Sequence, residues 1–285
     1  MIDAVSPVAL RRSTGVLDRI VARTVAELPG LRLPADATPS TLGPGAFCAA
    51  LRAGAQREEL GLCLIAEVKP ASPSRGRLLP RAAVPAYVHA VSGLAAALSV
   101  LIDTPHFDGG FDLLTQVRSL TNRPLLAKGF FVSPRQLTLA KASGADAVLL
   151  MASVLASDGL RALAEEARLL GLDLLFEAHD ADEILCIQDL VTHTQDSCVN
   201  MSIGVNARDL RTLAIDESRA RALLATLPAG PQAPLRVAES GIATRGVLDE
   251  LRGVADAVLV GSHLVTAVDP ANAARTLGFA GAVAP

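Results

Sequence analysis

The chain has 285 residues, of which 51% are hydrophobic and 19% are charged, and its formal net charge is −3. This composition excludes a disordered chain and leaves room for one large domain, such as an α/β barrel of about 250 residues, or for two modest domains. The sequence has no basic block and no basic patch studded with aromatic residues, so it offers nucleic acid no electrostatic site, although a small anion could bind locally.

The beginning of the chain and its cysteines favour the cytoplasm. The first residues lack the apolar segment of a signal peptide, and no apolar run approaches the ~18 residues that a membrane helix needs. The cysteines, Cys48, Cys63, Cys186 and Cys198, lie far apart without a CxxC pair, which argues against a zinc cluster and against a disulfide framework. We therefore expect a cytoplasmic protein with reduced thiols and no membrane partner.

The first sixty residues predict a helical extension. Two helical stretches flank a loop at residues 33–45 that is rich in proline, glycine and threonine. This segment does not follow the alternating pattern of the rest of the chain. We expect residues 1–60 to pack on the following domain as a cap, and we do not expect them to form a separate core.

From residue 62 onward, short apolar runs alternate with longer segments of helical periodicity. The runs consist almost entirely of Val, Leu, Ile and Ala, as is typical of strands that are covered on both faces. Eight such runs occur, at residues 62–68, 96–102, 124–127, 145–151, 172–178, 201–206, 235–240 and 255–261. Helical patterns between them include residues 134–143, 160–170, 217–227 and 245–252. Eight strand-then-helix units predict an α/β fold, a single (β/α)8 TIM barrel over residues 61–285.

Two observations favour the barrel over an open, doubly wound sheet. The pentapeptide ADAVL occurs at residues 145–149 and again at 255–259, four units later, although a match this short can arise by chance in a chain rich in Ala, Val and Leu. No GxGxxG turn follows the first predicted strand, where a dinucleotide-binding sheet would have one. Each observation is supporting evidence only.

Polar and ionisable residues stand at the carboxyl ends of the predicted strands. In chain order they are Glu67, Lys69, Lys128, Glu177, Asn206, Arg208, Glu239 and Ser240. The active sites of barrel enzymes lie at this end of the strands. Because the strands of a barrel run in parallel, these side chains are expected to converge on one site.

Lysine stands at only three of the 26 basic positions, Lys69, Lys128 and Lys141. Arginine keeps its proton near neutral pH, whereas a partly desolvated lysine can act as an acid or a base. We interpret Lys69 and Lys128, at strand ends, as proton-transfer groups that face the glutamates. The alternative is that both lysines are structural ion-pair partners. Lys141 falls on a polar helical stretch and is interpreted as a surface charge.

Glycine turns follow the last two predicted strands. Gly241, and Gly261 with Ser262, stand just before helical segments. Backbone N–H groups at such turns can approach an anion closely, and barrels commonly bind phosphate at these two loops. We therefore expect a phosphate site here, with ordinary tight turns as the alternative.

Two further polar segments are less informative. The segment SPSRG, residues 72–76, offers hydroxyls and a glycine on a loop, which by itself predicts only a turn. His179 and Asp180 have no second histidine at ligand spacing, so His179 is expected to be a loop histidine with hydrogen-bond partners and not a metal ligand. No metal or nucleotide motif occurs elsewhere in the sequence, and no cofactor is expected.

Taken in order, the motifs closely resemble the indole-3-glycerol phosphate synthase family. The resemblance runs from about residue 62 to residue 264 and includes IAEVKPASPSRG, LSVLID, LLAKGFF, GADAVLLMASVL, LLFEAHD, IGVNARDLRTLAID, VAESGI and DAVLVGSHL. The helical extension agrees, since family members carry extra helices before the barrel. The resemblance implies conversion of 1-(2-carboxyphenylamino)-1-deoxyribulose 5-phosphate to indole-3-glycerol phosphate, with loss of carbon dioxide and water and without cofactor or metal.

The resemblance also implies roles for single residues. Lys128 would be the general acid toward the sugar carbonyl, and Lys69 would pair with the anthranilate carboxylate. Glu67 and Glu177 would accept protons or stabilise charge. The remaining implied residues are Asn206 and Ser240 in the catalytic group, Arg208 and Glu239 in substrate positioning or its support, Ser72, Gly241, Gly261 and Ser262 for phosphate, and Phe107, Phe130, Leu149 and Leu210 around the anthranilate ring.

Three functions are compatible with these observations. A synthase of this family would use every group named above. A non-catalytic, regulatory barrel that binds phosphate would have no reason to keep the full set of proton-transfer groups. Another sugar-phosphate barrel enzyme, such as an isomerase, would explain the phosphate site but not the EVKPASPS and NARDL motifs. We expect a phosphorylated small molecule as the substrate, no nucleic acid partner, and a monomer or weak homodimer.

Overall fold

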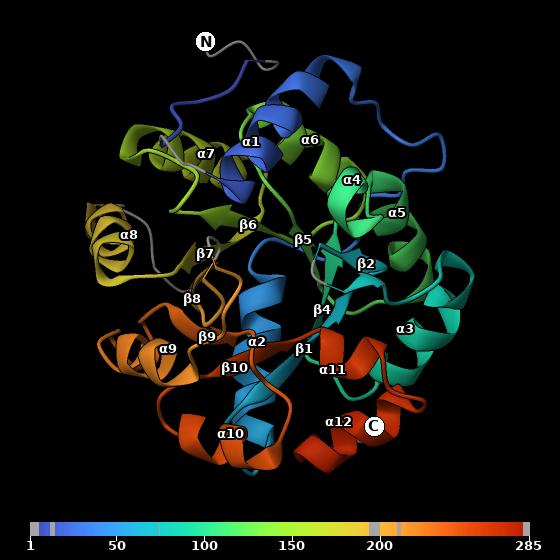
Figure 1. Cartoon of the computed structure of the whole chain (residues 1–285), viewed down its shortest axis with the longest axis vertical. Helices are drawn as coiled ribbons and strands as arrows, with labels where there is room; N and C mark the ends of the chain where they lie inside the picture. Colours follow the sequence, from blue (N-terminus) through green and yellow to red (C-terminus); the bar gives the residue numbers. More distant parts are fainter. Residues whose placement is uncertain (1–5, 12–14, 74, 194–199, 210–211, 282–285) are drawn as a thin grey trace.

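A computed structural model describes residues 6–11, 15–73, 75–193, 200–209 and 212–281 of the chain. Within these residues, eight parallel strands close a barrel in the order β1-β10-β9-β8-β7-β6-β5-β4 (Figure 1). The strands are β1 Cys63–Val68, β4 Ala97–Leu101, β5 Leu125–Lys128, β6 Ala147–Met151, β7 Asp173–Ala178, β8 Met201–Asn206, β9 Leu235–Glu239 and β10 Ala257–Val260. Every apolar run that was predicted to be a strand is one, and the predicted barrel is confirmed.

Helices alternate with the strands and surround the barrel (Figure 1). They are α3 Val84–Ser92, α4 Thr104–Phe107, α5 Phe111–Leu120, α6 Pro134–Ala142, α7 Ser157–Leu169, α8 Ala181–His193, α9 Glu217–Leu224, α10 Arg245–Leu251, α11 Ser262–Val265 and α12 Pro270–Leu277. The extension contributes α1 Val16–Glu27 and α2 Ala46–Arg57, and a hairpin of β2 Ala71–Ser72 and β3 Gly76–Arg77 follows β1. The four helices predicted between strands are present, with ends shifted by up to three residues.

Side chains at the helix starts explain where several helices begin. Ser133 and Gln136 form a capping box at the start of α6. The Ser133 hydroxyl accepts from backbone N–H groups of the first turn, and Gln136 Oε1 accepts from Ser133 N. Thr244 accepts from Val247 N at the start of α10, and Asp269 accepts from Asn272 N at the start of α12. These hydroxyls and carboxylates satisfy backbone donors that a helix leaves unpaired in its first turn.

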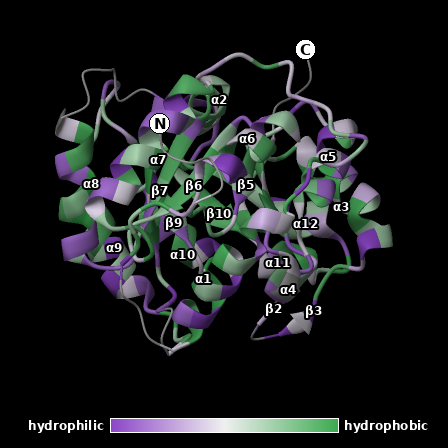
Figure 2. Ribbon diagram, turned by 90° about the horizontal axis from the view of Figure 1, so that it is seen from above, coloured by the Kyte–Doolittle hydropathy of each residue, from purple (hydrophilic) through white to green (hydrophobic). Residues whose placement is uncertain are grey.

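The strands are apolar because the barrel interior and the surrounding helices cover both of their faces. Every residue of β1, β4, β6, β7, β8, β9 and β10 is buried, and in β5 only the last residue, Lys128, is partly exposed. Figure 2 shows this distribution, with apolar segments toward the inside and polar residues on the outer helices. The buried glutamates at the strand ends are therefore exceptions that need charged or hydrogen-bonding partners.

Helix α2 lies across the amino-terminal end of the barrel, where it packs against β1, β4, β7 and β9 (Figure 1). Asp173, the first residue of β7, accepts hydrogen bonds from Gly45 N and Cys48 N, each at 2.8 Å. A carboxylate at this position also stabilises the positive end of the helix dipole. Gly54 allows close packing, since a Cβ there would lie 2.8 Å from the Cβ of Cys63. Helix α2 thus covers the end of the barrel opposite to the carboxyl ends of the strands.

The segment before α1 binds to the other end of the barrel. Val8 N donates to Val132 O at 2.8 Å, in the loop after β5. Arg11 N donates to Val154 O at 2.8 Å, in the loop after β6. The extension therefore contacts both ends of the barrel, and Val8 and Arg11 lie beside the loops that follow β5 and β6.

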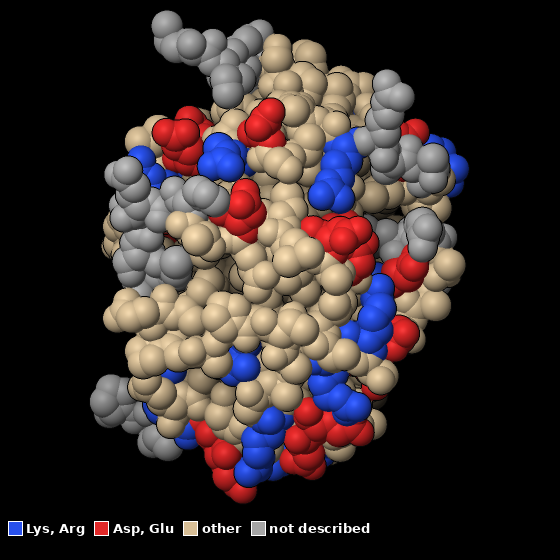
Figure 3. Space-filling view, turned by 90° about the vertical axis from the view of Figure 1, so that its left-hand side faces the viewer, with Lys and Arg blue, Asp and Glu red and all other residues tan. Residues whose placement is uncertain are grey.

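The surface shows no charge pattern that would attract nucleic acid on the face drawn in Figure 3. Basic and acidic side chains alternate there and do not form a patch of one sign. Among the described residues, no helix is both long enough and apolar enough to cross a membrane.

The contact between Asp173 and α2 gives a testable prediction about stability. We expect Asp173→Ala to lower the free energy of unfolding by about 2–3 kcal/mol, because the buried N–H groups of Gly45 and Cys48 lose their acceptor. Urea denaturation at pH 7 measures this loss. Asp269→Ala, which removes an exposed cap from α12, is the matched control and should cost about 1 kcal/mol. Equal losses in both variants would contradict the special role of Asp173.

Candidate active site

The carboxyl ends of the strands surround a cavity of about 510 Å³, a volume within the range of small-molecule sites. The residues predicted as catalytic all line it: Glu67, Lys69, Lys128, Glu177, Asn206 and Ser240. So do most of the predicted substrate-binding residues: Phe107, Phe130, Leu149, Arg208, Gly241, Gly261 and Ser262. The parallel direction of the strands brings these residues together from positions far apart in the sequence.

Two of the other predicted substrate-binding residues, Glu239 and Ser72, are not part of the cavity lining. Glu239 is buried next to the cavity and reaches it through Lys128, whose Nζ donates to Glu239 Oε2. Ser72 stands outside the cavity lining, and its hydroxyl accepts from Arg75 N at 3.2 Å. Leu210 lies outside the described residues.

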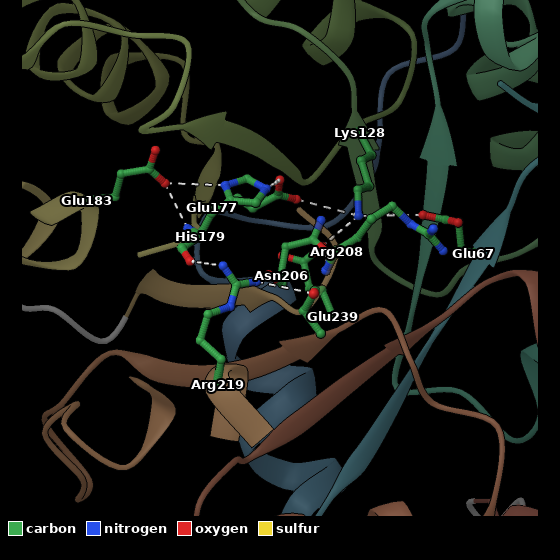
Figure 4. A network of polar contacts seen from close by, with 10 residues as sticks. Glu67, Lys128, Glu177, His179, Glu183, Asn206, Arg208, Arg219 and Glu239 are labelled. Atoms are coloured by element: carbon green, nitrogen blue, oxygen red, sulfur yellow. Dashed lines mark hydrogen bonds and ion pairs between the residues drawn. The ribbon is translucent and has the colours of Figure 1, made fainter. Parts of the chain in front are cut away.

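Among the described residues, three carboxyl groups surround the amine of Lys128 (Figure 4). Its Nζ lies 2.6 Å from Glu239 Oε2, 3.6 Å from Glu67 Oε2 and 3.7 Å from Glu177 Oε2. Burial by itself would lower the pKa of Lys128, but Glu239, Glu67 and Glu177 outweigh burial and raise it. The resting amine is therefore a charged ammonium that carries a proton at neutral pH.

Glu239 is the most deeply buried of these carboxyl groups. Burial raises its pKa to about 8, against the opposing effect of Lys128 and with a further increase from Glu177. Its Oε1 atom is buried and has no hydrogen-bond partner among the described residues. Gly204 makes room for this atom, since a Cβ on that glycine would collide with Oε1.

Glu67 and Lys69 form a second ion pair, in which Lys69 Nζ donates to Glu67 Oε1. Burial would raise the pKa of Glu67, but Lys69 and Lys128 outweigh it and hold that pKa below its usual value. Gly261 packs directly against the pair, because a Cβ there would collide with Glu67 Oε1 and lie 2.8 Å from Lys69 Nζ. A side chain at position 261 would therefore displace the ends of Glu67 and Lys69 whether or not phosphate binds there.

Hydrogen bonds fix the loops after β7 and β8. Asn206 Oδ1 accepts from Arg208 N at 3.0 Å. Arg219, from α9, donates to His179 O at 2.8 Å and to Asn206 O at 3.3 Å, and it also reaches Ala207 O at 3.2 Å (Figure 4). One guanidinium thus joins the backbone of two neighbouring loops at the rim of the cavity.

The turn after β9, at the expected phosphate site, has an unusual backbone. Ser240 has a φ of 66° and Gly241 a φ of 80°. A serine in this left-handed region is strained, and such strain is concentrated at functional sites. The carboxylate of Glu217 lies beside this turn, because a Cβ on Gly241 would be 2.9 Å from Glu217 Oε1. Glu217 is exposed at the start of α9, so a phosphate bound at this turn would require its side chain to rotate away.

Sequence reasoning missed several residues of the cavity lining, namely Arg75, Ile215, Glu217, His263 and Thr266. They come from loops and helix starts, and no pattern in the sequence indicates which way those segments turn. His179 Nδ1 has the kind of partner that was expected, Glu183, but Nε2 is buried without a hydrogen-bond partner among the described residues, and its contact with Glu177 was not predicted. Its Nε2 lies 3.4 Å from Glu177 Oε1, and its Nδ1 lies 3.3 Å from Glu183 Oε2. Within the described part of the chain, no group of histidine, cysteine and acidic residues is arranged to hold a metal ion.

Comparison with known proteins identifies the family of the chain that forms this cavity. The model of the indole-3-glycerol phosphate synthase family matches residues 27–277. The chain belongs to this family. The indole-3-glycerol phosphate synthase of Mycobacteroides abscessus is 39% identical over 278 residues, which cover 94% of this chain and 92% of the relative. That of Rhizorhabdus wittichii is 41% identical over 261 residues, which cover 90% of this chain and 93% of the relative. The resemblance inferred from the motifs is confirmed.

Solved structures of other proteins agree on the fold. A crystal structure of 3-hexulose-6-phosphate synthase matches with a TM-score of 0.59 and 15% identity, covering 78% of this chain and 100% of that chain. At this level of identity the match shows the barrel fold alone.

The packing of Gly261 against the Glu67–Lys69 pair can be tested directly. We expect Gly261→Ala to displace both side chains and to lower the free energy of unfolding by about 1–3 kcal/mol, since the new methyl group overpacks a buried site. A crystal structure and urea denaturation measure the two effects. Gly93→Ala, where a Cβ meets nothing within 4 Å, is the control and should leave stability unchanged or slightly higher. An unmoved ion pair in Gly261→Ala would refute this account of the glycine.

Proposed function

We propose that this chain is an indole-3-glycerol phosphate synthase, a carbon–carbon lyase. It converts 1-(2-carboxyphenylamino)-1-deoxyribulose 5-phosphate to indole-3-glycerol phosphate with loss of carbon dioxide and water. Membership of the family supports the activity. The observation that carries the proposal is the ammonium of Lys128, held in the cavity between the carboxyl groups of Glu67, Glu177 and Glu239.

The first chemical step, ring closure, needs an acid at the sugar carbonyl. A bond forms between the ring carbon that bears the carboxylate and the carbonyl carbon, and the carbonyl oxygen takes a proton from Lys128. The neighbouring carboxyl groups keep this proton on the amine until negative charge develops on the substrate oxygen. Carbon dioxide then leaves from the same ring carbon, and the electrons of the broken bond restore the aromatic ring.

The second step, dehydration, needs an acid and a base together. The hydroxyl group formed by ring closure leaves as water after it accepts a proton from Lys69, and Glu177 accepts the proton that the substrate loses. Glu67 stabilises the positive charge of both lysines, which lie within ion-pair distance of its two oxygens. The cavity thus contains an acid for each step and a base for the second.

Substrate binding uses the remaining groups of the cavity. Lys69 and Arg208 offer positive charge to the substrate carboxylate, with Asn206 and Ser240 positioned beside them. Phosphate binds at the turns of Gly241, Gly261 and Ser262, and Ser72 approaches it from the loop after β1. The anthranilate ring lies among Phe107, Phe130, Leu149 and Leu210. In support, all of these residues that the structure describes, with the exception of Ser72, line one cavity.

The regulatory barrel and the isomerase are less well supported. Burying Glu67, Glu177 and Glu239 around an amine costs desolvation free energy that a purely binding protein has no reason to retain. An isomerase would leave Lys69 and the apolar residues around the proposed ring site unexplained.

Several finer features belong to this proposal. We expect the enzyme to act in the cytoplasm without a cofactor, metal or nucleic acid, as a monomer or weak homodimer. We further expect residues 1–60 to serve as an extension and residues 61–285 as the catalytic barrel. Light scattering after gel filtration determines the oligomeric state.

The central prediction concerns Lys128. The parent protein should form the fluorescent indole product from the carboxyphenylamino substrate, and Lys128→Ala should lower kcat by about 10²–10⁴-fold, the usual contribution of an acid catalyst. Lys128→Arg separates proton transfer from ion pairing, because arginine keeps the charge but cannot release the proton. We expect Lys128→Arg to be as impaired as Lys128→Ala.

The control for both variants is Lys141→Ala. Lys141 lies on α6, where its Nζ donates to Gly171 O at 3.3 Å, and its removal should leave turnover unchanged. A parent without turnover would favour the regulatory barrel. Full activity of Lys128→Arg would show that the lysine serves as an ion-pair partner and not as the acid.

A further inference from the structure

A chain of close contacts leads away from Lys128 to a histidine outside the cavity lining (Figure 4). Glu177 Oε2 lies 3.7 Å from Lys128 Nζ, and the other oxygen of this carboxylate, Oε1, lies 3.4 Å from His179 Nε2. On the far side of the ring, His179 Nδ1 lies 3.3 Å from Glu183 Oε2. The imidazole therefore stands between two carboxylates, one of which faces the amine.

The local sequence explains how these groups come together. Glu177 is the last residue but one of β7, and His179 stands in the bend that directly follows the strand, where its ring meets the Glu177 carboxylate. Helix α8 begins just after them, and Asp180 Oδ1 accepts from Glu183 N at 2.9 Å. Glu183 turns back toward β7, where its Oε2 also accepts from His179 N at 2.7 Å. The start of α8 thus places a second carboxylate against the ring.

The three side chains are almost completely buried. The exposed fractions are 7% for His179, 5% for Glu183 and 2% for Glu177. Within the described residues, His179 Nε2 has no hydrogen-bond partner. The atom that faces it is the carboxylate oxygen Glu177 Oε1. A small movement on substrate binding would bring the two atoms to hydrogen-bond distance, since catalytic contacts are often long in a protein without ligand.

Charged groups lie around His179 on the elements that pack against it. They are Glu177 of β7, Asp180 before α8, Glu183 of α8, Glu239 of β9, Arg219 of α9, which donates to His179 O, and, beyond Glu177, Lys128 of β5. Burial opposes protonation of the ring. The carboxyl groups of Glu183, Glu177 and Glu239 outweigh burial and raise the pKa of His179.

We propose that His179 is a positioning residue, whose ring, held by Glu183, orients the Glu177 carboxylate toward Lys128 and keeps it ionised as the base of the reaction. The proposal rests on the function proposed above for Glu177. The ring lies on the side of the carboxylate away from Lys128, with Nε2 3.4 Å from Glu177 Oε1. An imidazolium in this place favours the charged carboxylate without occupying the substrate site.

A purely structural role for His179 predicts different behaviour. In that case the ring would serve only to fix the start of α8 through Glu183, and any side chain that keeps the contact with Glu183 would suffice. The amide nitrogen of asparagine occupies about the same place as Nδ1 of histidine, so His179→Asn keeps a donor for Glu183 but none for Glu177. The amide nitrogen of glutamine reaches about as far as Nε2, so His179→Gln keeps a donor for Glu177 without the charge.

The kinetic experiment compares these variants over a range of pH. We expect His179→Asn to lower kcat by roughly 10- to 100-fold, as small misplacements of a catalytic group do, with little change in KM. The acidic limb of its kcat/KM profile should move to higher pH, because the variant lacks the ring that faces Glu177 Oε1. His179→Gln should recover part of kcat but keep the shifted limb. His89→Asn, an exposed histidine on α3, should match the parent.

A second measurement needs no substrate. We expect NMR titration to show that the imidazole of His179, assigned by the signal lost in His179→Asn, has a pKa above the ordinary value in the parent and a lower one in Glu177→Gln. The inference fails if Glu177→Gln leaves this titration unchanged, or if His179→Asn keeps the parent's kcat and acidic limb. An inactive parent would overturn the proposed function, while the titration would still decide whether His179 and Glu177 interact.

Discussion

The structure depends on one electrostatic constraint, which is that an ammonium ion must be kept among carboxyl groups inside a barrel of apolar strands. The amine of Lys128, on β5, forms ion pairs with Glu67, Glu177 and Glu239, which come from β1, β7 and β9 of the barrel. Charges in such surroundings are costly unless each has a partner. Two glycines provide the space for them, Gly204 beside Glu239 and Gly261 beside Glu67. The composition of the strand ends follows from this need to balance charge as much as from the need to touch a substrate.

The two ends of the barrel differ in their packing: one carries well-satisfied structural contacts, and the other carries strained and unpaired groups. At the amino-terminal end, α2 packs on the strands and its first turn is satisfied by the buried Asp173. At the carboxyl end, Ser240 is held in a left-handed conformation, and Glu239 has a buried oxygen without a partner among the described residues. Such features cost free energy, and they occur together where substrate would bind. The core and α2 supply the stability that permits them.

The sequence predicted the barrel and the main ionisable residues of the cavity because both depend on local order. Continuous apolar runs mark covered strands, and the residue that ends a strand must face the mouth, so Glu67, Lys128 and Glu177 could be located without coordinates. How deep a side chain at a strand end is buried could not be located in the same way. Glu239, one residue before Ser240, lies behind the cavity and not in its lining. Loop residues such as Arg75 and His263 were missed because their positions depend on how a loop folds back, which no periodicity records.

The uses of arginine explain why lysine is so rare in this chain. Arg236 binds Asp256 through Nε and one terminal nitrogen, at 3.1 Å and 3.0 Å, and Arg118 combines a contact to Asp146 with bonds to backbone oxygens. Arg219 joins backbone oxygens of two loops. In each case a planar group with several fixed donors holds parts of the fold together and never releases a proton. Lys128 has a single nitrogen among carboxyl groups. In the function proposed above it releases a proton, so the choice between the two residues would follow the division between holding the fold and moving a proton.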